Sequence, residues 1–174
     1  IEALKLPGIV FQSSVKRTYP NSVFASHLLG FAQYDEKKGK ISGQIGLEAA
    51  LDEQLSGTDG SKEYQKDADG NALPGTEYTK AYAKNGDNVV LTLDRNVQQT
   101  LQSSLDKSVK KTYGGVRGWG IVMEVKTGKI LGWASSPSFD LNSRDDIKSF
   151  QDLPADFLYE PGSVMKGITY AAAV

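Results

Sequence analysis

Four apolar residues spaced four apart constrain the fold of this chain most: Val97, Leu101, Leu105 and Val109. This period places all four on one face of a helix, which we predict over residues 97–110 with Asp94 as its N-cap. A helix with one apolar face gains most of its stability from another element that covers that face. The neighbouring segments therefore have to supply a packing surface.

Those neighbouring segments have the composition of β-strands. Residues 89–93 (VVLTL) precede the helix, and residues 118–125 and 129–135 follow it. Lys126-Thr127-Gly128 separates the last two segments and suits a hairpin turn, because glycine accepts a positive φ. We predict an α+β fold, in which a sheet is flanked by helices.

The first half of the chain carries shorter signals. They predict a strand at 9–17, a short helix at 24–31, a helix at 45–55 ended by Gly57, and a hairpin turn at Asp69-Gly70. A boundary near Ala83 separates a small mixed module, residues 1–83, from a second unit, residues 84–174.

Composition excludes several classes of function. A length of 174 residues suits one ordinary domain or two small ones, and a net charge of −1 gives no electrostatic basis for binding nucleic acid. The chain has no cysteine and a single histidine, so thiolate and multi-histidine metal sites are excluded. We expect no cofactor and no metal.

The two ends suggest a piece of a longer protein. The chain opens at Ile1 without an initiator methionine, and residues 168–174 form a helix-compatible run with no stop signal. We expect the missing parts to hold a membrane anchor and the remainder of a domain.

Ser163 and Lys166 are the sharpest candidates for chemistry. Residues three apart share one face of a helix, so the hydroxyl and the amine come within reach of each other. A serine needs a base to become a nucleophile, and a lysine serves as that base when burial favours its neutral form. We expect Met165, Ile168 and the following alanines to supply an apolar wall, and the helix start to direct N–H groups at the serine.

The Ser-x-x-Lys pattern by itself carries little weight, because it occurs four times, beginning at Ser13, Ser104, Ser108 and Ser163. Only Ser163 follows a Pro-Gly turn and opens a helix. On the residues alone, a catalytic serine and an ordinary exposed helix start are equally supported.

A longer set of motifs resembles the monofunctional (class B) penicillin-binding proteins. Residues 159–166 (YEPGSVMK), preceded by 128–140 (GKILGWASSPSFD), resemble their nucleophile region. The upstream matches are 17–20 (RTYP), 25–30 (ASHLLG), 46–48 (GLE) and 55–57 (LSG) for the non-catalytic pedestal module, and 91–94 (LTLD) with Gln98 for the start of the transpeptidase domain.

The resemblance implies a D,D-transpeptidase that cross-links peptidoglycan stem peptides through an acyl-enzyme and is acylated by β-lactams. Ser163 then matches the nucleophile, Lys166 the lysine that activates it, and the Ser163 N–H one half of the oxyanion hole. The family's Ser-x-Asn and Lys-[Ser/Thr]-Gly motifs lie beyond Val174, in a C-terminal remainder of the domain. The resemblance also implies an extracytoplasmic catalytic domain on a single membrane anchor, with divisome or elongasome proteins as further partners.

Four features receive structural interpretations. Lys126-Thr127-Gly128 spells the third family motif, but it precedes the nucleophile and is interpreted as the hairpin turn. The calcium-like spacing at residues 67–71 lacks the required glycine and glutamate and predicts a turn. His27 is interpreted as a hydrogen-bonded structural residue, and Trp119 and Trp133 as cross-strand packing.

Two other functions stay open. A serine β-lactamase or β-lactam sensor uses the same Ser-x-x-Lys start, although neither carries a module like residues 1–83. Alternatively, residues 1–83 dock other wall-synthesis proteins, a role compatible with the enzyme.

Overall fold

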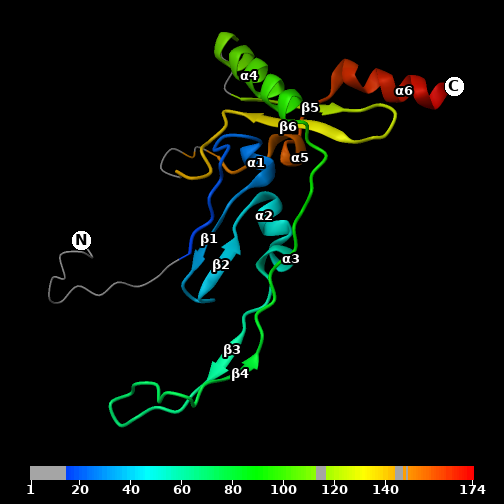
Figure 1. Ribbon diagram of the computed structural model, residues 1–174. Coiled ribbons are helices and arrows are strands. Elements are labelled where there is room, and N and C mark those ends of the chain that lie inside the picture. Colours follow the sequence, from blue (N-terminus) through cyan, green and yellow to red (C-terminus); the bar gives the residue numbers. More distant parts are fainter. Residues whose placement is uncertain (1–14, 113–116, 144–146, 148) are drawn as a thin grey trace.

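The computed structural model describes residues 15–112, 117–143, 147 and 149–174. Three two-stranded antiparallel sheets and several short helices follow one another along an elongated molecule (Figure 1). Within the described residues, no helix combines the length and the apolarity that crossing a bilayer requires.

The C-terminal part is built on one hairpin and one long helix. Strand β5 (Gly118–Met123) pairs with β6 (Ile130–Ser136), and α4 (Arg95–Lys111) packs against both strands. The predicted helix, hairpin and N-cap are confirmed: Asp94 Oδ1 accepts the N–H groups of Asn96 and Val97, each at 2.9 Å. The predicted turn is confirmed too, because Gly128 has a φ of +73° and its N–H donates to the Glu124 carbonyl at 2.8 Å.

Gln98 fastens α4 to the hairpin. Its side chain is 0% exposed; Nε2 donates to the Trp133 carbonyl at 2.9 Å, and the Trp133 N–H donates to Oε1 at 2.7 Å. Gln102 Nε2 donates in the same way to the Ser135 carbonyl at 3.0 Å. Side-chain amides of the helix therefore satisfy backbone groups of β6 as a third strand would.

Glycine allows the close approach of this helix. A Cβ added at Gly120 or Gly132 would lie 3.1 Å from a methyl group of Leu101, which is tighter than ordinary van der Waals contact. The apolar stripe of α4 thus packs directly on the backbone of the hairpin.

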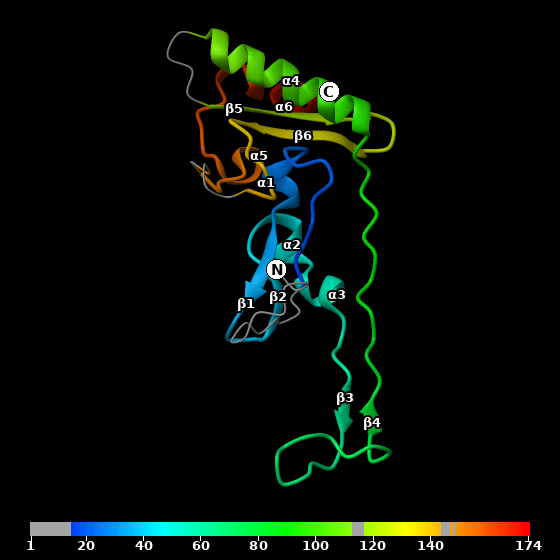
Figure 2. The same cartoon turned by 60° about the vertical axis from the view of Figure 1, so that its left-hand side comes forward.

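The described residues of the first half of the chain, called the N-terminal module below, form a series of small elements. They are α1 (Ser26–Leu29), β1 (Ala32–Asp35) paired with β2 (Lys40–Gly43), α2 (Gly46–Ala50), α3 (Asp52–Ser56), and β3 (Ser61–Glu63) paired with β4 (Tyr78–Ala81). The β3–β4 pair forms an arm that points away from the β5–β6 hairpin (Figures 1 and 2). A core of Phe31, Phe139 and Leu141 joins this module to the segment that follows β6.

The strand predicted at residues 89–93 is wrong. This segment is extended and runs beside the N-terminal module (Figure 2), but it belongs to no sheet. Its end is hydrogen-bonded to β6: Thr92 Oγ1 donates to the Ile130 carbonyl at 2.7 Å, and the N–H of Asp94, the next residue after the segment, donates to the Leu131 carbonyl at 2.9 Å. A strand needs a neighbouring strand that pairs with its backbone, and this segment has none among the described residues. The Val90 side chain is 93% exposed.

Several N-terminal boundaries also differ from the prediction. The helix expected at 24–31 covers only α1, because Gly30 adopts a φ of +68° against the Ile45 carbonyl and Phe31 leads into β1. The helix expected at 45–55 is two helices divided at Leu51, and Gly57 ends the second as predicted. Residues 9–14 lie outside the described residues, and residues 15–17 form no strand.

The predicted turn at Asp69-Gly70 is confirmed, but the hairpin around it is longer than expected. Asp67 Oδ1 accepts the N–H groups of Asp69 at 3.0 Å and Asn71 at 2.8 Å, which closes the tip of the arm. The paired strands β3 and β4 lie several residues further back. The calcium-like spacing is therefore that of a turn.

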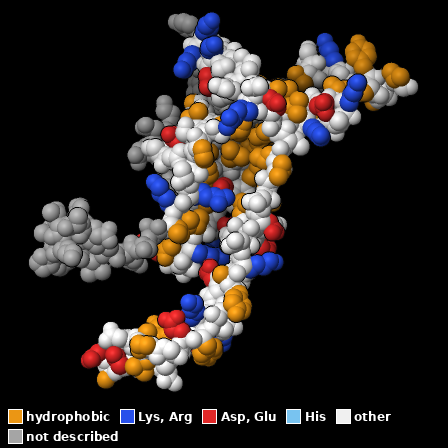
Figure 3. Space-filling model, viewed as in Figure 1, with side chains coloured by type: hydrophobic (Ala, Val, Ile, Leu, Met, Phe, Trp, Pro, Cys, Tyr) orange, Lys and Arg blue, Asp and Glu red, His pale blue; other side chains and the backbone are white. Residues whose placement is uncertain are grey.

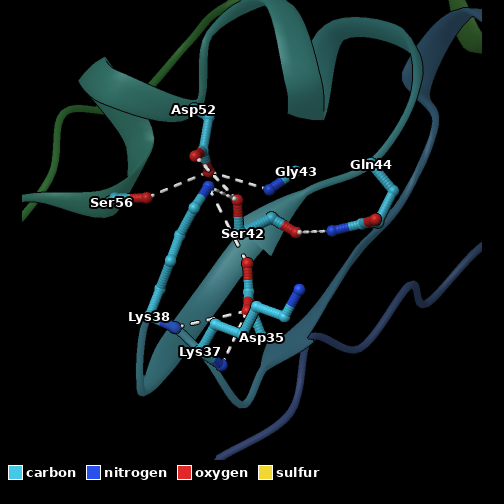
Figure 4. A network of polar contacts seen from close by, with 8 residues as sticks. All are labelled: Asp35, Lys37, Lys38, Ser42, Gly43, Gln44, Asp52 and Ser56. Carbon is cyan, nitrogen blue, oxygen red and sulfur yellow. Dashed lines mark hydrogen bonds and ion pairs between the residues drawn. The ribbon is translucent and has the colours of Figure 1, made fainter.

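A polar network ties β2 to α3 (Figure 4). Asp52 Oδ1 accepts the Gly43 N–H at 2.8 Å and the Ser56 hydroxyl at 3.1 Å, while Oδ2 accepts the Ser42 hydroxyl at 3.1 Å. Lys38 Nζ donates to the same Ser42 hydroxyl at 3.1 Å. The bond from the Gly43 N–H, followed by those from the two serines, lowers the pKa of Asp52 below its ordinary value.

Replacing Gln98 tests its role in fastening the helix. We expect Gln98→Ala to lower the free energy of unfolding by about 2–3 kcal/mol, because it leaves the Trp133 N–H and carbonyl buried without partners. Urea unfolding followed by tryptophan fluorescence measures this loss. The control Gln99→Ala, on the exposed side of α4, should change it by less than about 0.5 kcal/mol; equal losses would contradict the assignment.

The Asp52 network should make stability depend on pH. A carboxylate whose pKa is lowered in the folded state adds stability above its unfolded value of 3.8, and this stability is lost as the pH falls through the folded value. We expect Asp52→Asn to lose less melting temperature than wild type between about pH 6 and about pH 3. Asp59→Asn, an exposed control, should follow wild type.

Candidate functional site

The two candidate residues open the last helical segment. Ser163 lies in the 3-10 turn η2 (Gly162–Met165), and Lys166 is the first residue of α6 (Lys166–Ala173). The Lys166 N–H donates to the Ser163 carbonyl, and the Val164 N–H donates to the Pro161 carbonyl at 3.1 Å. The predicted helix start after Pro161-Gly162 is confirmed, and the two residues stand one turn apart.

The expected apolar wall around them is not formed by the described residues. Every residue of the 162–174 range is exposed, including Met165 at 43% and Ile168 at 63%. Helix α6 continues from η2 to the C-terminal end of the chain (Figure 1), and hydrophobic side chains lie uncovered on it (Figure 3). In this part of the chain, no hydrogen bond joins the Ser163 hydroxyl to the Lys166 amine.

The segment that leads into Ser163 is held on the hairpin by polar contacts. The Trp133 indole Nε1 donates to both Asp152 oxygens, at 3.0 and 2.9 Å. The Ser135 hydroxyl donates to Asp152 Oδ1 and lies within hydrogen-bond distance of the Leu153 N–H, both at 3.3 Å. These contacts fix the start of α5 (Leu153–Asp156) against β6.

Aromatic contacts continue the attachment towards the serine. The Arg117 guanidinium lies 4.4 Å from the ring centroid of Phe157, and the Trp119 and Tyr159 rings meet edge to face at 5.3 Å. Arg117 Nη1 also donates to Gln151 Oε1 at 3.2 Å. Residues 151–159 are thus attached at several points, the last of them four residues before Ser163.

Asp152 and His27 are two titratable groups that influence each other electrostatically. Burial raises the pKa of Asp152, while the hydrogen bond from Trp133 and the nearby His27 oppose that rise. Burial lowers the pKa of His27, against the attraction of Asp152 and a hydrogen bond with the Ser149 backbone. His27 is buried and packs edge to face on Phe139 at 4.8 Å, as its structural interpretation predicts.

The remaining interpretations have different outcomes. Lys126-Thr127-Gly128 forms the hairpin turn, with the Thr127 hydroxyl bonded to the Glu124 carboxylate. The two tryptophans lie on paired strands as predicted, Trp133 opposite Ile121 and Trp119 opposite Ser135. Both indoles also contact residues 151–159, which the prediction did not include. The other described Ser-x-x-Lys pairs lie on the exposed side of α4.

Sequence reasoning missed Asp152. It stands in a polar loop with no repeat or spacing, and the only local signal is an Asp before Leu-Pro, which indicates a helix start. Its partner Trp133 lies 19 residues earlier in the chain, so the contact has no signature in the sequence.

Comparison with known proteins decides the family. The family described as "Penicillin-binding Protein dimerisation domain" matches residues 2–91, more than half of the chain, and "Penicillin binding protein transpeptidase domain" matches residues 118–174. The chain belongs to the penicillin-binding proteins. It has the predicted α+β fold, a dimerisation domain followed by the first part of a transpeptidase domain. The boundary near Ala83 stays a prediction.

Several relatives share the whole length of the chain. It is 32% identical to the probable peptidoglycan D,D-transpeptidase PenA of Neisseria meningitidis over 177 residues, and 37% identical to stage V sporulation protein D of Bacillus subtilis over 179 residues. Both alignments cover 100% of this chain, but only 29% and 26% of the relatives. This penicillin-binding protein chain thus spans less than a third of their length.

A solved structure agrees with this assignment. The crystal structure of penicillin-binding protein 2X from Streptococcus thermophilus superimposes with a TM-score of 0.74 at 35% identity. The superposition covers 91% of this chain and 24% of that protein.

Proposed function

We propose that the protein carrying this chain is a peptidoglycan D,D-transpeptidase that cross-links stem peptides through an acyl-enzyme on Ser163. The observation that carries the proposal is the position of Ser163, at the start of a helix one turn before Lys166, within the range matched to a transpeptidase domain. PenA, a relative over the whole chain, is named for this activity.

The chemistry follows from the roles of the two side chains. The Ser163 Oγ attacks a carbonyl carbon of the donor stem peptide while its proton passes to the Lys166 amine. The peptide bond breaks, the leaving amine takes up a proton, and an amine of a second stem peptide then displaces the serine. A β-lactam acylates the same oxygen, but its opened ring stays attached.

The proposal requires a covered site. A neutral lysine is favoured by burial, and the described residues leave Lys166 exposed. We therefore assign the cover, the second-motif hydroxyl and the strand that completes the oxyanion hole with the Ser163 N–H to a C-terminal remainder of the domain. We further place the catalytic domain outside the cytoplasm, on a membrane anchor.

Two observations bear on the alternatives. The match of residues 2–91 to a dimerisation domain favours a transpeptidase over a β-lactamase or sensor. The rate at which the β-lactam adduct is hydrolysed separates a transpeptidase, in which it is slow, from a β-lactamase. The arm exposes Tyr64, Tyr78 and Tyr82, which supports docking of divisome or elongasome proteins by the same molecule.

Labelling with a fluorescent penicillin tests the nucleophile. In the intact protein, Ser163→Ala should abolish labelling with little change in melting temperature, because the lost hydroxyl is small and lies at a helix start. Lys166→Ala should slow labelling about 10²–10⁴-fold, as loss of a general base does. The controls Ser104→Ala and Lys107→Ala, on α4, should label as wild type. Mass spectrometry locates the adduct, and an adduct elsewhere would refute the assignment.

The chain of residues 1–174 tested alone should form no stable adduct. It holds the nucleophile and its lysine but leaves both exposed, and groups that act as a unit lose activity together. Mixing it with the C-terminal remainder should restore labelling at Ser163. Efficient labelling of the chain alone would show that the remainder is unnecessary.

A further inference from the structure

We propose that Asp152 is a positioning residue for acylation, whose carboxylate holds residues 151–159 on β6 and thereby sets the place of Ser163. This inference rests on the proposed function of Ser163. It assigns to one side chain the link between the hairpin and the turn that carries the nucleophile.

The direction of the carboxylate distinguishes this role from helix capping. Asp152 occupies the N-cap position of α5, where an aspartate ordinarily accepts N–H groups of its own helix. Here its side chain makes no capping bond, and both oxygens instead accept the Trp133 indole N–H. At the start of α5 it is the Asp152 backbone, and not its carboxylate, that bonds within the helix: the Asp152 N–H donates to Asp156 Oδ2 at 3.2 Å.

Ser135 doubles the attachment. The Ser135 hydroxyl donates to Asp152 Oδ1, and the Ser135 Oγ accepts the N–H of Leu153. The Leu153 side chain is buried. The carboxylate, the hydroxyl and the backbone therefore form one closed network between β6 and the start of α5. Such a network fixes position more tightly than apolar packing, because its bonds are directional.

The strand end of this network is itself rigid. The Trp133 backbone is bonded in both directions to the buried Gln98 of α4. The indole that meets Asp152 thus projects from a strand held by a helix. Further along the chain, the Arg117–Phe157 and Trp119–Tyr159 contacts hold the segment on the hairpin up to four residues before Ser163.

Two other titratable groups act on the Asp152 carboxylate. They are His27 of α1, across the interface with the N-terminal module, and Asp156 of α5. A partly buried carboxylate keeps its place only when donors satisfy it, and the indole and the hydroxyl are those donors. Removal of the carboxylate therefore frees the segment rather than merely removing a charge.

The test measures acylation of the intact protein by a fluorescent penicillin, as a first-order rate constant at saturation and a half-saturating concentration. We expect Asp152→Leu to lower the rate constant about 10–100-fold, since small misplacements of reacting groups cost that much, and to leave the half-saturating concentration within about threefold. Asp152→Asn, which keeps an acceptor for the indole, should recover most of the rate. Trp133→Phe, which removes the donor and leaves Asp152 in place, should resemble Asp152→Leu.

The matched control is Asp94→Ala, which removes the N-cap of α4. It should lower the melting temperature without slowing acylation of the folded protein, because the Asp94 carboxylate bonds to N–H groups of its own helix, α4. A wild-type rate in Asp152→Leu, or equal slowing in Asp94→Ala, would overturn the inference. If Asp152→Leu does not fold, a wild-type rate in Trp133→Phe overturns it instead. If the wild-type protein is not labelled at Ser163, the proposed function fails and this inference fails with it.

Discussion

The paired hydrogen bonds between Gln98 and Trp133 are the interaction on which the rest of the C-terminal part depends. A two-stranded hairpin alone is marginally stable in water, and this hairpin is completed by a helix whose amides bond to its backbone. The close approach that these bonds require is possible because Gly120 and Gly132 face Leu101. The helix and the hairpin therefore form one unit.

Trp133 extends this unit towards the candidate site. Its backbone holds α4, while its indole holds Asp152 and so the segment that ends at Ser163. One residue thus connects the most buried polar side chain of the described structure to the turn with the proposed nucleophile. The indole acts as a structural donor here.

The junction with the N-terminal module uses the residues that directly follow β6. His27 of α1 packs on Phe139, the Phe139 N–H lies 3.3 Å from the Ser26 hydroxyl, and Phe31 contributes to the same core. The start of the transpeptidase domain is therefore seated on the dimerisation domain by Phe139 and Leu141, which follow β6. The long arm and α6 lie at opposite ends of this joint region (Figure 1).

The sequence by itself determined the features that depend on neighbours in the chain. The period of four in α4, the Asp94 cap, the turn at Gly128 and the stop at Gly57 are local, and the motifs around Ser163 are enough to indicate the family. Only tertiary structure decided which side chains meet across long separations: Gln98 and Trp133 are 35 residues apart, and Asp152 lies 19 from Trp133. It also decided that residues 89–93 form no strand and that Met165 and Ile168 form no wall. Strand pairing and burial depend on residues far away in the sequence. These partners are brought together only when distant segments pack, so a local sequence pattern does not identify them.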